Sequence, residues 1–202
     1  MIDQTAIDIN AQQLVQKLQQ KIPTKFSGLY MLKDVLDPTI LSRLKTYIES
    51  VNPEQWQTVQ GQESKPRSRI SWDTDTVIEE LHEIFNSATT TINDIFPDVY
   101  KHFWGISIWQ DQEGYSMNWH TDNPDIDVAL QLYLYTEPGF GTIFQNNDTQ
   151  TLIPSIHNTG YLALHTGDNK IPHKTENMVH PGVTRYSLYA VWSRSPKYSA
   201  DS

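Results

Sequence analysis

A change in the spacing of apolar residues near residue 101 constrains the fold of this chain more than any other feature. Before that point apolar side chains recur every three or four residues, and after it they alternate with polar or small ones. The segment 128–134 alternates most clearly, with one face formed by Val128, Leu130, Leu132 and Leu134. Its other face carries Gln131 and Tyr133. The pattern predicts an α+β fold that is mainly β, with the helices first.

Three helices are expected before residue 101. Apolar spacing predicts helices over residues 7–22 and 75–95. Between them, Asp37 is placed to cap a helix that starts at Pro38 and continues to about Ser50. A strand-like run covers residues 26–32.

The polar segment 52–68 predicts a surface loop. It contains Lys65 and Arg67, and Arg69 follows it. Segments between helices and sheets often flank functional sites, so residues 55–68 are either a substrate-selecting lid or a solvated connector.

Six strands are expected after residue 101: 104–109, 128–134, 141–145, 151–154, 160–164 and 185–192. Many short strands after helices predict a β-sandwich or barrel with a helical layer. We expect one domain over residues 1–202, in which 1–100 are mostly helical support and 101–195 form the β core.

Composition limits the chemistry that is open to the chain. It has no Cys, which excludes disulfides, thiolate nucleophiles and Cys-ligated metals, so any metal must use His, Asp or Glu. The formal charge of -9, with no run of Lys and Arg, argues against nucleic acid and anionic membranes as partners. No apolar stretch is long enough to span a bilayer, and no leader is apparent, so we expect a cytoplasmic protein.

The triplet His120-Thr121-Asp122 is the strongest candidate for a metal site. In an extended strand the side chains of His120 and Asp122 leave the same face and can converge on one ion. A distant second imidazole would complete the two-His, one-carboxylate set of a mononuclear iron site. His173 is the preferred second imidazole, with His165 and His180 as alternatives. The ordinary alternative is a surface His beside an Asp that opens a turn.

Arg185 interrupts the near-continuous apolar strand 183–192. A cation there is costly unless an anion pairs with it, and the guanidinium fork suits a carboxylate. Ser187 shares its face and could donate a second hydrogen bond. The alternative is a structural ion pair with an acid of the chain.

In this order the motifs resemble the iron(II)- and 2-oxoglutarate-dependent dioxygenases, most closely their prolyl-4-hydroxylase-like branch. The resemblance covers roughly residues 103–192. It rests on Gly114-Tyr115 before His120-Thr121-Asp122-Asn123-Pro124, on Tyr133-Leu134, on Pro172-His173, and on Thr184-Arg185-Tyr186 opening a strand that ends in Trp192. Arg185 follows His173 by twelve residues, which is longer than is common in the family.

The resemblance implies a double-stranded β-helix, the jelly roll of the cupins. It implies that His120, Asp122 and His173 bind Fe(II), and that Arg185 holds the distal carboxylate of 2-oxoglutarate with Ser187 or Tyr133. Such an enzyme consumes O2, releases succinate and CO2, and usually hydroxylates its substrate, with ascorbate as a supporting reductant. The metal carboxylate Asp122 favours oxygen transfer over halogenation. The substrate would be a peptide side chain or a small molecule.

Candidate substrate contacts are Trp109, Tyr115 and Gln131, although aromatic residues before the first ligand serve core packing at least as often. Two other functions remain open: a non-catalytic cupin-like module that binds a metal or sugar, and a metal-dependent hydrolase. Neither needs an anion receptor such as Arg185.

Overall fold

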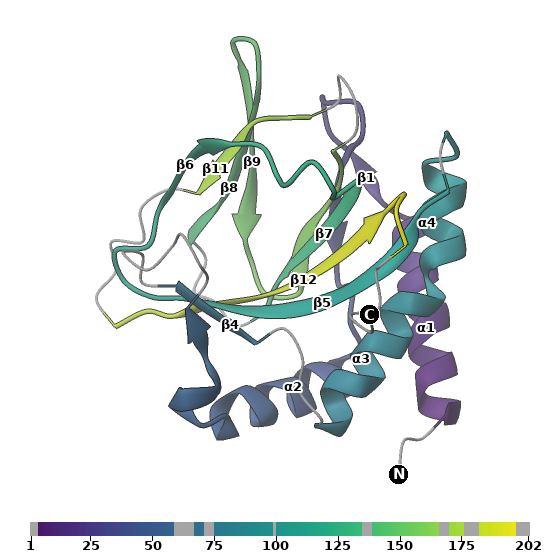
Figure 1. Cartoon of the computed structure of the whole chain (residues 1–202), viewed down its shortest axis with the longest axis vertical. Helices are drawn as coiled ribbons and strands as arrows, with labels where there is room; N and C mark the ends of the chain where they lie inside the picture. The colour runs from purple at the N-terminus through teal and green to yellow at the C-terminus, as the bar shows by residue number, and fades with distance from the viewer. Residues whose placement is uncertain are drawn as a thin grey trace, which may run out of the picture.

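Two antiparallel β-sheets face each other, and helices cover the outer side of the larger sheet (Figure 1). The computed structural model describes residues 4–58, 67–70, 75–98, 100–134, 139–165, 170–175 and 182–196. The eight-stranded sheet has the order β1-β2-β10-β7-β12-β5-β4-β3, and the four-stranded sheet has the order β6-β11-β8-β9.

The helical elements are α1 (Gln4–Gln19), α2 (Pro38–Ser50), the 3-10 turn η1 (Pro53–Gln55), α3 (Thr76–Ser87) and α4 (Thr89–Ile95). The strands of the larger sheet are β1 (Ile22–Pro23), β2 (Leu29–Lys33), β3 (Gln57–Thr58), β4 (Arg67–Ile70), β5 (His102–Asp111), β7 (Val128–Tyr133), β10 (Thr159–Leu164) and β12 (Arg185–Ser193). Those of the smaller sheet are β6 (Met117–His120), β8 (Gly139–Asn146), β9 (Thr149–Ser155) and β11 (His173–Thr175). In the described part of the chain, no helix combines the length and apolarity needed to traverse a bilayer.

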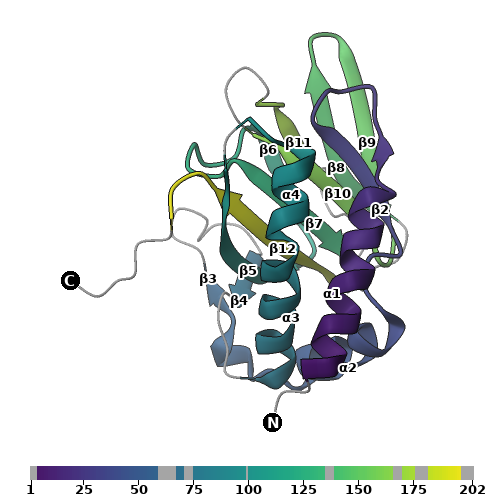
Figure 2. The same ribbon diagram turned by 90° about the vertical axis from the view of Figure 1, so that its right-hand side faces the viewer.

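The alternation along β7 divides the interior into two cores. Val128, Leu130 and Leu132 pack against the helices, and Figure 2 shows α1 lying beside α3 and α4 on that face. Tyr133 points the other way and packs with residues of the smaller sheet such as Phe144. The predicted α+β fold, mainly β with a helical layer, is therefore confirmed.

The sequence located α2 correctly and misplaced α1. Asp37 caps α2 as predicted, accepting a hydrogen bond from the backbone N–H of Thr39 at 2.7 Å. By contrast, α1 starts and ends three residues before the predicted segment 7–22. Two apolar residues within the predicted segment, Ile9 and Ile22, are 52% and 40% exposed.

The single helix predicted for residues 75–95 is wrong, because the chain forms α3 and α4 with a break at Ala88. The N–H of Ala88 bonds to Phe85 three residues back, which tightens the last turn of α3. The next three residues are threonines that begin α4, and β-branched residues have a slightly lowered helix propensity. The side chain of Thr89 accepts a hydrogen bond from Trp192 at 3.1 Å.

The segment 52–68, predicted to be a loop, contains η1 and β3 and leads into β4. Its residues 59–66, which include Lys65, lie outside the described part of the structure. β4 pairs with β5, with Arg67 opposite Asp111 and Arg69 opposite Trp109. Apolar alternation did not reveal β4, because one face of this strand carries polar residues that line a cavity rather than a core.

Candidate metal centre

The pairing of β6 with β11 brings the two predicted histidine ligands together. His120 and His173 are directly opposite each other in the register, and their ring centroids are 4.3 Å apart. β6 ends at His120, yet Asp122 in the following segment still turns toward both rings. The ligand atoms of His120, Asp122 and His173 all lie within 4.8 Å of one another, so one ion can reach all three.

Backbone carbonyls orient both imidazoles. Nδ1 of His120 lies 2.8 Å from the carbonyl oxygen of Asn118, and Nδ1 of His173 lies 3.2 Å from that of Ile171. An Nδ1–H donating to a carbonyl fixes the tautomer in which Nε2 carries the free lone pair. Nε2 is therefore the atom that each ring offers to a metal.

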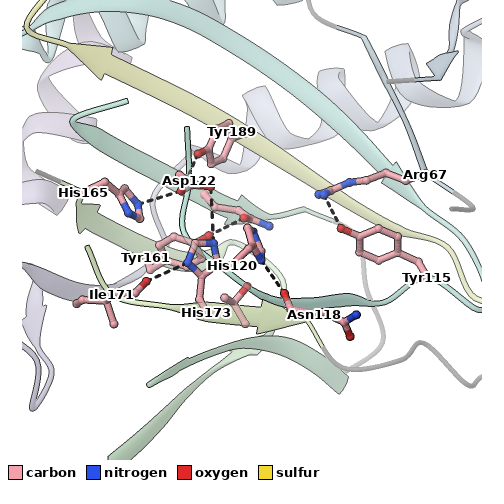
Figure 3. Close-up of polar contacts among 12 residues, drawn as sticks. Arg67, Tyr115, Asn118, His120, Asp122, Tyr161, His165, Ile171, His173 and Tyr189 are labelled. Atoms are coloured by element: carbon pink, nitrogen blue, oxygen red, sulfur yellow. Dashed lines mark hydrogen bonds and ion pairs between the residues drawn. The ribbon is translucent and has the colours of Figure 1, made fainter. Parts of the chain in front are cut away.

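The Asp122 carboxylate is held through one of its two oxygens (Figure 3). Tyr189 donates a hydrogen bond to Oδ2 at 3.1 Å, and Nε2 of His165 lies 3.1 Å from the same oxygen. Oδ1 lies 3.7 Å from Nε2 of His173. Oδ1 is thus the oxygen on the side where a metal would bind.

The electrostatics favour the protonation states that metal binding needs. Burial works against the charged form of Asp122, but His165, His173, His120 and Tyr189 outweigh it and lower the pKa of the carboxyl. Burial lowers the pKa of the His165 and His173 imidazoles despite the neighbouring carboxylate. An ionised carboxylate beside neutral imidazoles is the donor set that binds a divalent metal.

The alternatives for the second imidazole differ in their positions. His165 is buried at the end of β10 and contacts the far oxygen of Asp122, so it lies behind the carboxylate. It is not one of the three residues whose ligand atoms cluster. His180 lies outside the described residues.

Arg185 is not alone at its buried position, because it forms an ion pair with Asp111. Nη2 of Arg185 lies 2.7 Å from Asp111 Oδ2. Arg67 approaches the other oxygen of the same carboxylate, with Nε 2.8 Å from Oδ1. Among the described residues, one carboxylate, that of Asp111, is thus shared by two guanidinium groups. Burial opposes the charge on Arg185, but Asp111 and the neighbouring tyrosines hold the pKa of Arg185 above its ordinary value.

Ser187 and Tyr133 lie beside this cluster. The Ser187 hydroxyl is fully buried and has no hydrogen-bond partner among the residues described. The Tyr133 hydroxyl lies 2.7 Å from Thr142 Oγ1, and the Arg185 guanidinium lies 5.7 Å from the Tyr133 ring centroid. A buried hydroxyl without a partner is costly, so Ser187 suits a site that an additional polar group completes.

A cavity of about 550 Å³ adjoins the three ligands. Its lining includes His120, Asp122, His173, Arg67, Arg69, Trp104, Trp109, Gln131, Thr142 and Tyr189. Arg185, Ser187 and Tyr133 do not line it. Arg67 and Thr142 do line it. Arg67 belongs to the Arg185 cluster, which consists of Arg185, Asp111 and Arg67, and Thr142 contacts the hydroxyl of Tyr133. These two residues therefore connect the cluster to the cavity wall.

The predicted substrate contacts divide in the same way. Trp109 and Gln131 line the cavity, whereas Tyr115 is fully buried beside it and its hydroxyl is bonded to Arg67. Burial raises the pKa of Tyr115 to about 12, so this hydroxyl stays protonated. The core-packing explanation fits Tyr115 and does not fit Trp109.

Sequence reasoning missed Asp111 and Tyr189. Asp111 is the last residue of β5, where an acid looks like an ordinary strand end. Tyr189 lies on the same face of β12 as Arg185 and Ser187, and that shared face was the one available indication of its role.

Comparison of the sequence with protein-family models and with curated proteins gives no match. Solved structures match in fold. An oxidoreductase of the 2OG-Fe(II) oxygenase family from Burkholderia pseudomallei has a TM-score of 0.65 and 13% identity, covering 96% of this chain and 93% of that one. A Pseudomonas putida prolyl-4-hydroxylase has a TM-score of 0.67 and 14% identity, covering 93% and 100%. HygX from Streptomyces hygroscopicus, solved with nickel and 2-oxoglutarate, has a TM-score of 0.62 and 10% identity, covering 85% and 84%.

The chain therefore has the fold of the 2-oxoglutarate/iron(II) oxygenases, prolyl-4-hydroxylases among them, as its motifs predicted. At these identities the comparison establishes the fold, and the activity is argued from the site.

Proposed function

We propose that residues 1–202 form one Fe(II)- and 2-oxoglutarate-dependent dioxygenase domain with a double-stranded β-helix core. The observation that carries the proposal is the convergence of His120, Asp122 and His173 beside a cavity in a chain with this fold. Two imidazoles and one carboxylate on one side of an ion leave positions open for reactants, which is the ligand set of the non-haem iron oxygenases.

The residues fit the metal in detail. His120 and His173 present Nε2, because carbonyls occupy their Nδ1 atoms. Tyr189 and His165 occupy Oδ2 of Asp122, so the carboxylate offers one oxygen. Iron(II) bound there would couple O2 to the decarboxylation of 2-oxoglutarate, placing one oxygen atom in succinate and the other in the substrate as a hydroxyl group.

In this proposal the Arg185 cluster receives the distal carboxylate of 2-oxoglutarate. If Asp111 were paired with Arg185 alone, it would neutralise that guanidinium, and Arg185 would have no reason to bind a further anion. Among the described residues, however, Asp111 is shared with a second guanidinium, from Arg67, so two positive charges meet one carboxylate, and the Ser187 hydroxyl supplies an unused donor. Tyr133 stays protonated, because burial raises the pKa of its hydroxyl. The Arg67–Asp111 contact would also hold Arg185 in place before the carboxylate arrives.

The substrate in this proposal presents a C–H bond and is small enough to enter the cavity. A HygX structure holds hygromycin B together with nickel and 2-oxoglutarate, so this fold can admit a small molecule. A metal-dependent hydrolase would use the same three ligands to activate water. The excess charge around Asp111 favours the oxygenase, because hydrolysis requires no carboxylate receptor there.

Anaerobic titration with Fe(II) and 2-oxoglutarate tests the proposal. The wild-type protein should develop the weak visible charge-transfer band of a 2-oxoglutarate chelate, and Asp122→Ala should not. Asp125→Ala, an exposed acid three residues away, is the matched control and should keep the band. A wild type without the band, or an Asp122→Ala variant with an unchanged one, would end the proposal.

A further inference from the structure

The edge strand β4 places two arginines on the wall of the cavity beside the candidate metal centre. Arg67 and Arg69 both line the cavity, and the register sets Arg69 opposite Trp109 on β5. The intervening Ser68 and the following Ile70 do not line it, and Ile70 packs into the helical core. The alternation of β4 thus directs both cations toward the cavity.

The two arginines differ in their partners. Arg67 is held by the ion pair with Asp111, by the hydrogen bond that it donates to Tyr115, and by stacking 4.0 Å from the Trp109 ring centroid. Arg69 lies 5.6 Å from the same ring. Within the described residues it has no carboxylate partner. A half-buried guanidinium without an acid, in a cavity wall, is available to an anion from solution.

The charges around the cavity support the same conclusion. The chain carries a formal charge of -9, yet the described cavity lining has two arginines and one acid, Asp122. In the proposed holoenzyme the two charges of iron(II) are cancelled by those of 2-oxoglutarate, and Arg185 is cancelled by Asp111. Asp122 then cancels only one of the two cavity arginines. Counting the described residues, one positive charge remains at the cavity after metal and co-substrate are bound.

We infer that the oxidised substrate is a small organic acid whose anionic group binds Arg69, supported by Arg67 on the Trp109 platform. This inference rests on the proposed function. The apolar part of the substrate would lie along Trp104, Ile126 and Val191, which line the same cavity. A volume of about 550 Å³ falls within the range of small-molecule sites. The residual charge on an otherwise acidic protein would also draw anions selectively to this opening.

A matched acid and amide test the inference. The probes are 3-phenylpropionate, 3-phenylpropanamide and phenyl phosphate, titrated by ligand-observed saturation-transfer NMR against metal-free protein and against protein loaded with Mn(II) and saturating 2-oxoglutarate. At least one anion should bind ten times more tightly than the amide, and the better of the two identifies carboxylate or phosphate chemistry. Arg69→Gln should weaken that anion about tenfold or more while leaving the amide unchanged, since a hydrogen bond to a charged group is lost. Arg69→Lys should restore part of the affinity.

The control is Lys45→Gln, which removes the same unit of charge from an exposed position on α2 and should change nothing. Equal binding of acid and amide, binding of none of the probes, or indifference to Arg69→Gln overturns the inference. Displacement of the anion by 2-oxoglutarate overturns it too, because Arg69 would then serve the co-substrate. If the protein forms no chelate with Fe(II) and 2-oxoglutarate but the metal-free protein still binds the acid through Arg69, the anion site stands and the proposed oxygenase falls.

Discussion

At the scale of single residues, the candidate site depends most on how Asp122 is held. Tyr189 and His165 contact Oδ2, and Oδ1 faces the imidazole of His173. Burial and the nearby carboxylate raise the pKa of Tyr189 well above its ordinary value, so its hydroxyl remains a donor. Such contacts orient a ligand without touching the metal.

Tyr189→Phe should weaken metal binding by roughly tenfold to a hundredfold, because the carboxylate loses the hydrogen bond that orients it. The dissociation constant of Mn(II), measured by electron paramagnetic resonance, reports this directly. Tyr186→Phe on the same strand removes a hydroxyl bonded to Gln110 and should leave the constant unchanged. Equal affinity in wild type and Tyr189→Phe would show that the contact has no orienting role.

The two imidazoles near Asp122 are expected to respond differently. His173→Ala should abolish specific metal binding, since a ligand is lost, whereas His165→Ala should retain one bound metal per chain with reduced affinity. Metal stoichiometry by calorimetry separates the two results. If His173→Ala retained one metal and His165→Ala lost it, His165 would be the metal ligand and His173 the supporting residue.

Arg185→Gln should raise the dissociation constant of 2-oxoglutarate by at least thirtyfold, in line with the ~2–5 kcal/mol typical of a buried charge partner. Titration of the chelate band measures this, with metal affinity measured separately. Arg194→Gln removes a half-exposed arginine that is paired with Asp127 and is the charge-matched control. An unchanged constant would remove Arg185 from the co-substrate site.

At the scale of elements, the contact between β10 and β7 supports the cavity wall, and it leaves no space at Gly160. A Cβ at Gly160 would lie 1.8 Å from the carbonyl oxygen of Gln131, a distance that forces the strands apart. Tyr161 donates a hydrogen bond to the side chain of the same Gln131 at 2.8 Å, so separation would also disturb the cavity lining.

Gly160→Ala should lower the free energy of unfolding by more than about 3 kcal/mol, or prevent folding. Gly182→Ala provides the comparison. Among the described residues its Cβ meets nothing within 4 Å, and its positive φ of 73° is strained, which costs roughly 1–2 kcal/mol. Urea unfolding of both variants measures the difference. Comparable losses in the two variants would contradict the close packing of β10 against β7.

Periodicity located the strand β7 but missed the strand β4 and the break between α3 and α4. The alternation from Val128 to Leu134 located β7 and its two faces, since each face meets a different core. The first two residues of β4 were predicted as loop, because the strand carries Arg67 and Arg69 toward a cavity and so lacks an apolar face there. The break at Ala88 also escaped, because the apolar repeat continues from α3 into α4.

For the site, the sequence indicated residue types but not their partners. The spacing of Arg185 and Ser187 showed that their side chains share one face of a strand. The pairing of Arg185 with Asp111, by contrast, depends on how β5 and β12 align. The contact of His165 with Asp122 likewise joins residues from different sheets and has no local pattern. Contacts between distant strands are set by the fold as a whole, so no spacing rule reveals them.

At the scale of the whole molecule, the buried imidazoles make the stability of the metal-free protein depend on pH. The folded-state pKa values of His165 and His173 lie below the ordinary 6.5, chiefly because of burial. On acidification the unfolded chain therefore takes up protons at these residues before the folded chain does. Stability is fully present above about pH 6.5 and falls as the pH drops from there toward the lowered values.

The free energy of unfolding should fall from pH 7.5 to pH 5.5 with a slope of up to about 1.4 kcal/mol per pH unit for each histidine. Chemical denaturation of metal-free protein measures the slope. His165→Leu should flatten it, because the buried imidazole is removed. A slope that His165→Leu leaves unaltered would contradict the burial of a neutral imidazole at this position.

In the proposed enzyme, His120, Asp122 and His173 would hold one metal, and 2-oxoglutarate would extend from that metal to the Arg185 cluster. Crystals grown with Mn(II) and 2-oxoglutarate test this through the anomalous difference map. We predict one peak within coordination distance of Nε2 of His120, Nε2 of His173 and Oδ1 of Asp122, with 2-oxoglutarate density running from it to the guanidinium of Arg185. A peak at other ligands, or 2-oxoglutarate density that turns away from Arg185, would contradict the account.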